Sequence, residues 1–290
     1  MTVLETIQRS TEFLEKKAVE SPRLQSELLL AHLLKLPRMQ LYLKFERELS
    51  VSEVDAFREL VRRRGQREPL QYIVGSTSFC GLEIAVNPHV LIPRPETELL
   101  AERGWNFLRQ LLESGARKGS RLTALDFGTG SGCLAIALAA KCLEARIDAV
   151  DISAQALAIA KQNAERLDVA ERIHFYEGDA LPKQDGSISF DLIVSNPPYI
   201  PSAEIETLEP EVRDHEPRGA LDGGPEGLDY FRRLARSVAA FLKPGGQLMM
   251  EFGDGQADAI RQIVESEKWI VEAIQNDYNQ RPRIIAVRRA

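Results

Sequence analysis

The segment Asn196-Pro197-Pro198-Tyr199 directly follows an apolar run, Phe190–Ser195, that has the composition of a strand. Two prolines remove two backbone N–H donors and fix the chain, so the neighbouring carbonyl groups stay free to accept hydrogen bonds. The Asn196 side-chain oxygen and the Pro197 carbonyl can then hold both N–H bonds of an amide or aromatic amino group, whose delocalised lone pair makes it a poor nucleophile. Tyr199 adds an aromatic face for stacking. The pattern predicts transfer chemistry at a planar nitrogen, and the alternative is a rigid turn after a strand.

A glycine-rich loop lies earlier in the chain, between the strand candidate Arg121–Gly128 and the helix candidate Leu134–Ala140. Glycines at such a turn allow a tight bend and the close approach of a ligand, and the helix N-terminus offers free N–H groups to an anionic ligand. The dinucleotide-binding fingerprint needs a third glycine where this chain has Cys133. The loop instead resembles the cofactor loop of class I S-adenosylmethionine methyltransferases, and a glycine turn without a ligand is the alternative. The predicted cofactor-binding residues of the loop are Gly128, Thr129, Gly130, Ser131 and Gly132.

Acidic residues stand at the ends of the next two strand candidates. Asp151 lies at the carboxyl end of Arg146–Ile152, and Asp179 follows Ile173–Gly178. Open α/β sheets bind ligands at the carboxyl ends of their strands. We therefore expect Asp151 to accept both ribose hydroxyls of a nucleoside and Asp179 to accept from an adenine amino group. The alternatives are a helix N-cap for Asp151, although Ser153 is better placed for it, and a turn aspartate for Asp179.

Composition narrows the class of protein. The chain has 290 residues, of which 44% are hydrophobic and 28% charged, with a formal net charge of −6. These values fit one large globular domain, or one large and one small, and argue against non-specific nucleic-acid binding by the whole surface. Cys80, Cys133 and Cys142 form no metal or disulfide pattern, so we expect a reducing cytoplasm and no metal. We find neither a signal peptide nor an apolar stretch long enough to span a membrane.

The first 70 or so residues predict a small helical domain. Ser21 and Pro22 predict the N-cap and first residue of a second helix, and a shorter segment near residues 39–43 is helical. Ser50 and Glu53 form a capping box that opens a fourth helix. This helix ends near Arg62–Gly65, where the cations complement the helix dipole. With Glu59 and Glu68 beside them, we interpret these arginines as a solvated surface rather than a nucleic-acid site.

The remainder predicts a β-hairpin linker and an α/β domain. Tyr72–Gly75 and Leu82–Val86 have the pattern of a hairpin. From Leu99 onward strands alternate with helices, which is typical of a doubly wound, mostly parallel sheet. The last two strands lack a helix between them, so one should run antiparallel. The predicted domains are 1–70, 71–95 and 96–290, and the seven strand candidates are Arg121–Gly128, Arg146–Ile152, Ile173–Gly178, Phe190–Ser195, Gln247–Phe252, Ile270–Gln275 and Ile284–Arg288.

With these motifs in place, nearly the whole chain resembles the bacterial release-factor glutamine methyltransferases of the HemK type. The shared stretches include Gln71–Gly75, Leu91–Glu98, Asp126–Gly132 and Asn196–Tyr199, and further ones at 216–224 and 281–284. Asn-Pro-Pro-Tyr also occurs in DNA adenine methyltransferases, whereas Ile-Pro-Arg-Pro-Glu-Thr-Glu at 92–98 is much more specific.

The resemblance implies a seven-stranded sheet joined to a small helical domain, and methylation of the glutamine in a Gly-Gly-Gln loop of peptide chain release factors. By motif match, the loop Gly128–Gly132, Asp151, the Asp179-Ala180 turn and Asn196 would line S-adenosylmethionine. Asn196, Pro197, Pro198 and Tyr199 would hold the glutamine. A monomer that recognises its partner through the helical domain, without membrane or direct nucleic-acid contact, is the expected state.

Two positions depart from the family pattern. Relatives often carry an aromatic residue where this chain has Ala180, and another where it has Cys80. The first departure raises the question of what packs against adenine, for which Phe127 or Leu181 are candidates. The second concerns the hairpin rather than the chemistry.

Three alternative functions remain open. A glutamine methyltransferase of a ribosomal protein would share the chemistry. A nucleic-acid methyltransferase acting on an exocyclic amine would need a cationic surface. Residues 196–230 instead hold nine acidic residues against two arginines, a formal charge of −7, so we expect this segment to repel phosphate. A non-catalytic cofactor-fold module is the third, against which an intact Asn-Pro-Pro-Tyr argues.

Overall fold

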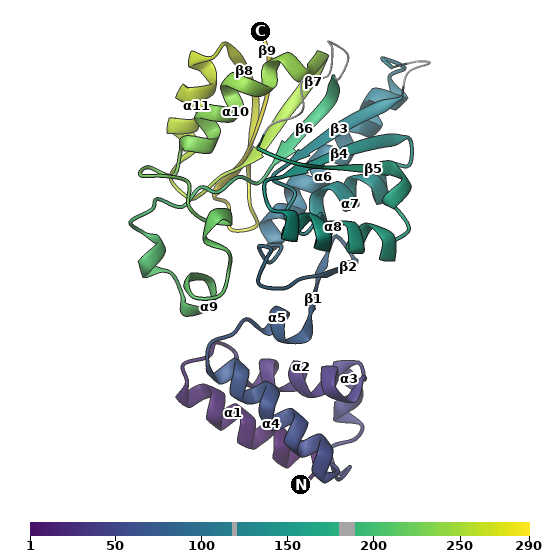
Figure 1. Ribbon diagram of the computed structural model, residues 1–290, viewed down its shortest axis with the longest axis vertical. Helices are drawn as coiled ribbons and strands as arrows, with labels where there is room; N and C mark the ends of the chain where they lie inside the picture. The colour runs from purple at the N-terminus through teal and green to yellow at the C-terminus, as the bar shows by residue number, and fades with distance from the viewer. Residues whose placement is uncertain (118–120, 180–188) are drawn as a thin grey trace. The chain divides into compact units, whose positions relative to one another are not determined.

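The computed structural model describes residues 1–117, 121–179 and 189–290, which form two compact units (Figure 1). The helical unit comprises Met1–Ser76 together with Glu209–His215, and the sheet unit comprises Thr77–Leu208 and Glu216–Ala290. A short piece of chain that follows the Asn-Pro-Pro-Tyr motif therefore belongs to the helical unit.

The helical unit has a core of its own, in which Ile7, Leu14, Leu30 and Phe57 are buried. The predicted capping box is confirmed: the Ser50 hydroxyl accepts from the Glu53 N–H at 3.2 Å, and the Ser50 N–H donates to the Glu53 carboxylate at 2.9 Å. The helices are α1 (Val3–Lys16), α2 (Pro22–Leu34), α3 (Arg38–Tyr42), α4 (Val51–Gly65), α5 (Leu70–Val74) and, in the returning segment, α9 (Pro210–Arg213).

Two local predictions are wrong. Pro22 does begin α2, but Ser21 is in the left-handed region at φ 48° and makes no capping hydrogen bond with its side chain. The Tyr72–Gly75 stretch is not a strand, because α5 occupies Leu70–Val74 and ends at Gly75 with φ 87°. The hairpin begins after α5 and is formed by β1 (Ser76–Phe79) and β2 (Leu82–Ala85).

The sheet unit contains seven strands in the order β5-β4-β3-β6-β7-β9-β8. Neighbouring strands from β5 through β7 pair in parallel, and β9 pairs antiparallel with both β7 and β8, which confirms the predicted reversal. A helix expected between β5 and β6 falls largely outside the described residues. The strands are β3 (Leu122–Phe127), β4 (Ala145–Asp151), β5 (Ile173–Glu177), β6 (Phe190–Ser195), β7 (Leu242–Glu251), β8 (Trp269–Asn276) and β9 (Pro282–Arg289).

Helices cover the sheet in two groups. In Figure 1, α6 (Pro95–Glu113), α7 (Cys133–Lys141) and α8 (Ala154–Arg166) lie on one side, and α10 (Asp229–Ser237) and α11 (Ala257–Ser266) on the other. The chain order reverses between β3 and β6, so the connections that leave these two strands diverge. Such a switch point opens a crevice at the carboxyl ends of the strands, where open α/β sheets bind their ligands.

Within the described ranges, no helix combines the length and the apolar character that crossing a membrane requires.

Candidate active site

The Asn-Pro-Pro-Tyr motif begins where β6, a fully buried strand, reaches the switch point. The Ser195 hydroxyl donates to the Phe127 carbonyl at 2.7 Å, which ties the end of β6 to the end of β3. The predicted substrate residues and the predicted glycine loop, separated by some seventy positions in the sequence, therefore start from adjacent strand ends.

Asn196 and Pro197 present the acceptors that the sequence predicts. Asn196 is half-buried, and its Nδ2 donates to the Thr97 hydroxyl at 3.1 Å. With its amide N–H group used in this way, the side-chain oxygen is left to accept. Pro197 is buried, and no described residue donates a hydrogen bond to its carbonyl. Two acceptors thus stand next to each other in the chain.

Tyr199 is held from both its backbone and its ring. Its carbonyl accepts from the Gln256 Nε2 at 2.9 Å, and its ring packs against the core of the sheet unit. Burial, and secondarily the nearby Glu251 carboxylate, raise the pKa of the Tyr199 phenol to about 12. The phenol therefore stays neutral at physiological pH, so Tyr199 offers an aromatic surface rather than a base.

Glycines lie against the Pro198-Tyr199 backbone. A Cβ atom on Gly223 would lie 2.8 Å from the Pro198 carbonyl oxygen and 2.9 Å from the Tyr199 Cα. The same turn pairs with the motif through Ile200, whose N–H donates to the Leu221 carbonyl and whose carbonyl accepts from the Gly223 N–H. The Gly-Gly sequence at 223–224, which formed part of the family resemblance, is thus a backbone support for the motif.

The glycine loop bends as its composition predicts. Gly128, Gly130 and Gly132 all have positive φ, at 77°, 55° and 82°. The N–H groups of Gly128 and Thr129 both donate to the Val150 carbonyl at 2.9 Å, which anchors the loop to β4. A Cβ on Gly128 or Gly130 would meet no atom within 4 Å, so the loop faces open space at these two positions. Such a cradle suits the close approach of a ligand.

Asp126 lies beneath this loop and received no role from the sequence. It is fully buried, and one carboxylate oxygen accepts from the Thr129 hydroxyl at 2.6 Å and from the Ala135 N–H at 3.1 Å. The other oxygen, Oδ1, has no hydrogen-bond partner in the described part of the chain. Burial raises the pKa of Asp126 to about 7, against the effect of those two bonds. Its place at the end of β3 is the signal that could have found it.

Asp151 supports the loop directly. Its two carboxylate oxygens accept from the Gly130 N–H at 2.8 Å and from the Ser153 N–H at 2.9 Å. A carboxylate has about four lone-pair sites, so each oxygen can still accept from a ribose hydroxyl. The predicted N-cap of the following helix is Ser153, whose hydroxyl accepts from the Ala156 N–H at 3.1 Å. Asp151 is therefore free of the capping role.

Asn163 also holds the glycine loop, and the sequence analysis missed it. It is fully buried on α8, and its Nδ2 donates to the Ser131 carbonyl at 2.9 Å and to the Ala85 carbonyl at 3.0 Å. Its Oδ1 accepts from the Ala85 N–H at 2.8 Å. The Asn163 amide thus joins the hairpin strand β2 to the glycine loop. In the sequence, a polar residue on an otherwise apolar helix face is a weak signal for this role.

Asp179 makes two contacts with an arginine side chain that the sequence did not predict. Its exposed carboxylate forms an ion pair with Arg233 of α10 at 3.1 Å, and its carbonyl accepts a hydrogen bond from the same arginine. Ala180 and Leu181, which bear on the packing of adenine, lie outside the described residues. Phe127, the other candidate, is half-buried at the end of β3.

Glu251 is a second buried carboxyl group that the sequence analysis missed. It ends β7, where its neighbour Met250 pairs with Ser195, and it is 1% exposed. Burial raises the pKa of Glu251 to about 7, while the nearby Thr97 hydroxyl opposes the rise. Its Oε2 has no hydrogen-bond partner among the described residues. An acid at the end of an apolar strand was the available signal.

The structure shows which residues the motif at 92–98 contacts. Arg94 forms an ion pair at 2.5 Å with Glu216, a carboxylate that is nearly fully buried and also accepts from the Ile92 N–H at 3.2 Å. The motif thus packs against the Glu-Pro-Arg segment at 216–218. Three residues further on, Thr97 meets Asn196, so this stretch also reaches the Asn-Pro-Pro-Tyr motif.

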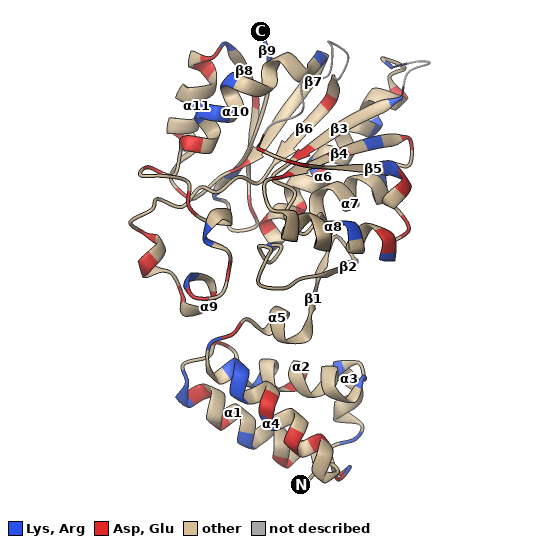
Figure 2. Ribbon diagram, in the orientation of Figure 1, with Lys and Arg blue, Asp and Glu red and all other residues tan. Residues whose placement is uncertain are grey.

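The acidic segment after the motif is largely neutralised by ion pairs. Of its nine acidic side chains, eight form ion pairs, including Glu211 with Arg64 and Arg67 inside the helical unit. The arginines at the end of α4 are paired in the same way, Arg62 with Glu59 and Arg63 with Glu68. Figure 2 shows basic and acidic residues mixed along the helices of the helical unit. The formal charge of −7 is therefore a poor guide to the surface of this segment.

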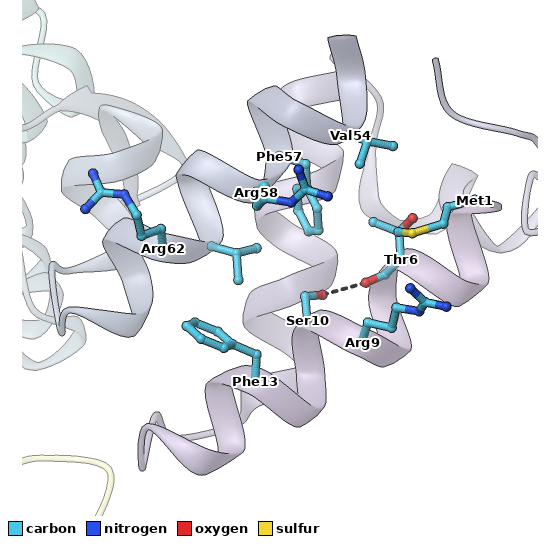
Figure 3. A pocket seen from close by; sticks show the side chains of 10 residues that line it. Met1, Thr6, Arg9, Ser10, Phe13, Val54, Phe57, Arg58 and Arg62 are labelled. Atoms are coloured by element: carbon cyan, nitrogen blue, oxygen red, sulfur yellow. Dashed lines mark hydrogen bonds between the residues drawn. The ribbon is translucent and has the colours of Figure 1, made fainter. Parts of the chain in front are cut away.

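A cavity of about 420 Å³ lies in the helical unit, between α1 and α4 (Figure 3). Phe13, Phe57 and Val61 line it with apolar surface, and Arg58 and Arg62 stand at it with their charges paired to Asp55 and Glu59. None of the residues predicted to bind cofactor or substrate line this cavity.

Known families match both parts of the chain. A family model described as the PrmC N-terminal domain matches residues 5–75, and one described as the Methyltransferase small domain matches residues 102–209. The release factor glutamine methyltransferase of Geobacter sulfurreducens is 45% identical over 259 residues, which cover 89% of this chain and 87% of that protein. The protein of the same name from Chlorobaculum tepidum is 44% identical over 97% of this chain and 95% of its own length.

Solved structures share the fold at low sequence identity. A methyltransferase from Pyrococcus furiosus has a TM-score of 0.51 and 19% identity, and covers 72% of this chain and 90% of its own. The human METTL16 catalytic domain, in complex with an RNA hairpin, has a TM-score of 0.54 and 14% identity, and covers 82% of this chain and 81% of its own. These similarities establish the methyltransferase fold of the sheet unit.

Proposed function

The chain belongs to the release factor glutamine methyltransferases, S-adenosylmethionine-dependent enzymes, and we propose that the strand ends of its sheet unit carry the transfer of a methyl group to the glutamine side chain of a peptide chain release factor. The observation that carries this proposal is the pair of acceptors at Asn196 and Pro197, beside an open glycine cradle. The Asn196 amide is bonded to Thr97, and the Pro197 carbonyl has no donor among the described residues.

S-adenosylmethionine, when bound, supplies a methyl group activated by the adjacent sulfonium. We assign its binding to the loop Gly128–Gly132, to Asp151 and to Asn196. Two features suit this ligand: the open space at Gly128 and Gly130, and the Asp126 oxygen that has no partner in the described part of the chain. Asp179 and Ala180 belong to the same assignment, with Asp179 sharing its carboxylate between Arg233 and the ligand.

We assign the glutamine to Asn196, Pro197, Pro198 and Tyr199. The Asn196 Oδ1 and the Pro197 carbonyl accept the two N–H bonds of the glutamine amide, which fixes the plane of that group and supports positive charge as it develops on nitrogen. Fixed dipoles of this kind need no reorganisation during the reaction and are therefore effective. The neutral phenol ring of Tyr199 packs on the flat amide.

The substrate assignment is tested by transfer of a labelled methyl group from S-adenosylmethionine to purified release factors, ribosomes and DNA, measured side by side. We expect labelling of the release factor, and loss of the label when its Gly-Gly-Gln glutamine is replaced by alanine. Labelling of ribosomes instead would favour the ribosomal-protein alternative, and efficient labelling of DNA would reverse the assignment. The DNA arm matters because the acidic segment is too well paired to exclude nucleic acid by charge.

We further propose that the helical unit recognises the release factor, since the predicted cofactor motifs all lie in the sheet unit. We also propose that the enzyme works as a monomer in the cytoplasm, in line with three cysteines that are all free thiols.

A further inference from the structure

Asn163, a fully buried residue of α8, uses its side-chain amide as the hydrogen-bond partner of a strand end. Its Oδ1 accepts from the Ala85 N–H at 2.8 Å, and its Nδ2 donates to the Ala85 carbonyl at 3.0 Å. Ala85 is the last residue of β2, which lies next to α8 (Figure 1). The Asn163 amide therefore bonds both backbone polar groups of Ala85, as a residue of a neighbouring strand does in a hydrogen-bonded pair.

The same amide also holds the second half of the glycine loop. The Asn163 Nδ2 donates to the carbonyl of Ser131, a residue that is 2% exposed, at 2.9 Å. The next residue, Gly132, packs closely on α8, because a Cβ atom there would lie 3.0 Å from the Ala160 Cβ. Two consecutive residues of the loop thus lie against the helix that also bonds β2.

The orientation of the Asn163 amide is determined by the backbone groups around it. An asparagine amide has two hydrogens to donate and one oxygen that accepts. Both hydrogens are donated to carbonyl groups, of Ala85 and Ser131, and the oxygen accepts from an N–H. A flipped amide would place its oxygen against two carbonyl oxygens. If β2 moves away, the amide loses two of its three bonds, and its contact with Ser131 is no longer fixed.

We propose that Asn163 is a positioning residue for the cofactor, which couples the end of β2 to the conformation of the glycine loop, so that bound S-adenosylmethionine and an ordered β2 stabilise each other. This inference rests on the proposed binding of the cofactor to that loop. A loop with three glycines at positive φ has many other conformations open to it, and it needs an anchor on each half to keep one of them. Such coupling between two sites is reciprocal.

The first test is amide hydrogen exchange in the wild-type protein, with and without S-adenosylmethionine. An amide that exchanges through an opening that also destroys the cofactor site is slowed by up to about 100-fold at a cofactor concentration of 100 times Kd. We expect the Ala85 N–H to be slowed by at least about tenfold through this linkage. Its slowing is compared with that of an amide elsewhere in the same hairpin.

The comparison amide is that of Cys80, at the turn of the hairpin. Its N–H donates to the Glu98 carboxylate at 2.9 Å and not to α8. Because its opening does not involve Asn163, the cofactor should slow its exchange by less than about twofold. Equal slowing of the Ala85 and Cys80 amides, or no slowing at Ala85, would overturn the inference.

The second test is the affinity of an Asn163→Leu variant, which keeps most of the side-chain volume and loses every hydrogen bond. If the freed loop holds its binding conformation about one tenth of the time, the dissociation constant for S-adenosylmethionine rises about tenfold. Isothermal titration measures it at a temperature where melting curves show each variant folded. A purely structural role would lower the melting temperature and leave the affinity of the folded protein unchanged.

Arg166→Ala is the matched control. Arg166 lies three residues further along α8 and donates to the Glu83 carbonyl of β2, and among the described residues it has no hydrogen bond with the glycine loop. This variant should keep the wild-type affinity. A folded Asn163→Leu with the wild-type dissociation constant, or an Arg166→Ala that loses as much affinity as Asn163→Leu, would contradict the proposal. If Asn163→Leu does not fold, the exchange comparison in the wild-type protein decides.

Asp151→Ala separates this inference from the proposed cofactor site. Weaker binding by Asp151→Ala, together with unchanged binding by a folded Asn163→Leu, would remove only the positioning role of Asn163. Unchanged binding by both variants would remove the cofactor from the glycine loop, and the inference with it. Weaker binding by both, with Arg166→Ala unaffected, is the result that we expect.

Discussion

Buried carboxyl groups stand at the ends of the two strands that flank β6, Asp126 on β3 and Glu251 on β7. Burial raises the pKa of each to about 7, and each keeps one oxygen without a partner in the described chain. Carboxyl groups in such positions cost stability, and perturbed pKa values gather at functional sites. Asp126 contacts the glycine loop through the Thr129 hydroxyl, whereas Glu251 ends the strand that pairs with β6, next to the start of the Asn-Pro-Pro-Tyr motif.

Asp151 is expected to contribute to cofactor binding in two ways, by accepting from ribose and by holding the Gly130 N–H in place. Asp151→Ala should therefore weaken S-adenosylmethionine binding by about 2–3 kcal/mol, the scale of hydrogen bonds to a charged group. Isothermal titration measures this loss. Asp148, on the same strand but before its end, offers a control in Asp148→Ala, and equal affinities for wild type and Asp151→Ala would remove Asp151 from the site.

Glu251 makes folding stability depend on pH. Its folded pKa of about 7 lies above the ordinary value of 4.5, so the folded state binds this proton more tightly than the unfolded chain does. The resulting penalty is absent below 4.5, grows as pH rises through the window from 4.5 to about 7, and is complete above it. Glu251→Gln, which cannot ionise, should therefore melt at a higher temperature than wild type above pH 7.

The size of this gain is at most about 3 kcal/mol. Melting curves of both proteins across the window measure it, and Asp126, present in both, cancels in the difference. A difference in melting temperature that stays constant with pH would argue against a raised pKa at Glu251.

At the scale of elements, the Asn-Pro-Pro-Tyr motif is held by segments other than β6, the strand that it follows. β6 ends at Ser195, and beyond it the Pro198-Tyr199 backbone lies against Gly223 and is bonded by Gln256 from the start of α11. Glycine at 223 allows this contact because no Cβ intervenes. Its φ is not in the left-handed region, so the requirement is for space and not for an unusual backbone conformation.

Gly223→Ala is therefore expected to displace the motif, because its Cβ would lie 2.8 Å from the Pro198 carbonyl oxygen. A shift of about 1 Å in a positioned group can cost roughly 10²-fold in rate. Gly219→Ala is the matched control, since a Cβ there meets no atom within 4 Å and its φ is also ordinary. Rate and melting temperature are measured for both, and equal rates would show that the motif does not depend on this contact.

At the scale of the whole molecule, two separate stretches of the chain form the helical unit. Glu211, in the segment that returns to this unit after the Asn-Pro-Pro-Tyr motif, forms ion pairs at 2.6 Å with the buried Arg64 and with Arg67. Removing one partner of such a buried pair costs folding stability, because the other charge is left buried without a partner. The helical unit is therefore completed by a segment that lies, in the sequence, between the two stretches of the sheet unit.

A chain shortened to begin at Thr77 should still bind S-adenosylmethionine, because Gly128–Gly132, Asp151 and Asn196 all lie in the sheet unit. It should lose methyl transfer to an intact release factor if the helical unit recognises that partner. Titration of the cofactor and labelling of the release factor measure the two properties, with a Gly-Gly-Gln peptide as a substrate that needs no second contact. Full activity on the intact release factor would contradict a recognition role.

The sequence by itself determined the elements and the chemistry. Hydrophobic periodicity and capping residues predict most helices and all seven strands, because these signals are local. The residue types at Gly128–Gly132, Asp151 and Asn196–Tyr199 predicted a methyl transfer to a planar nitrogen. Local signals failed at Ser21 and at Tyr72–Gly75, where backbone conformation follows from the packing around the chain.

Only the tertiary structure decided which side chains support that chemistry. Thr97 is separated from Asn196 by about a hundred positions, and only the packing of α6 brings the two side chains into contact. Glu251 is about fifty positions away, and only the pairing of β6 with β7 places it at the neighbouring strand end. The same holds for charge. The acidic segment counts as −7 in sequence, but its carboxylates meet arginines from elsewhere in the chain. Coulomb interactions depend on distance in space, which the order of residues does not state.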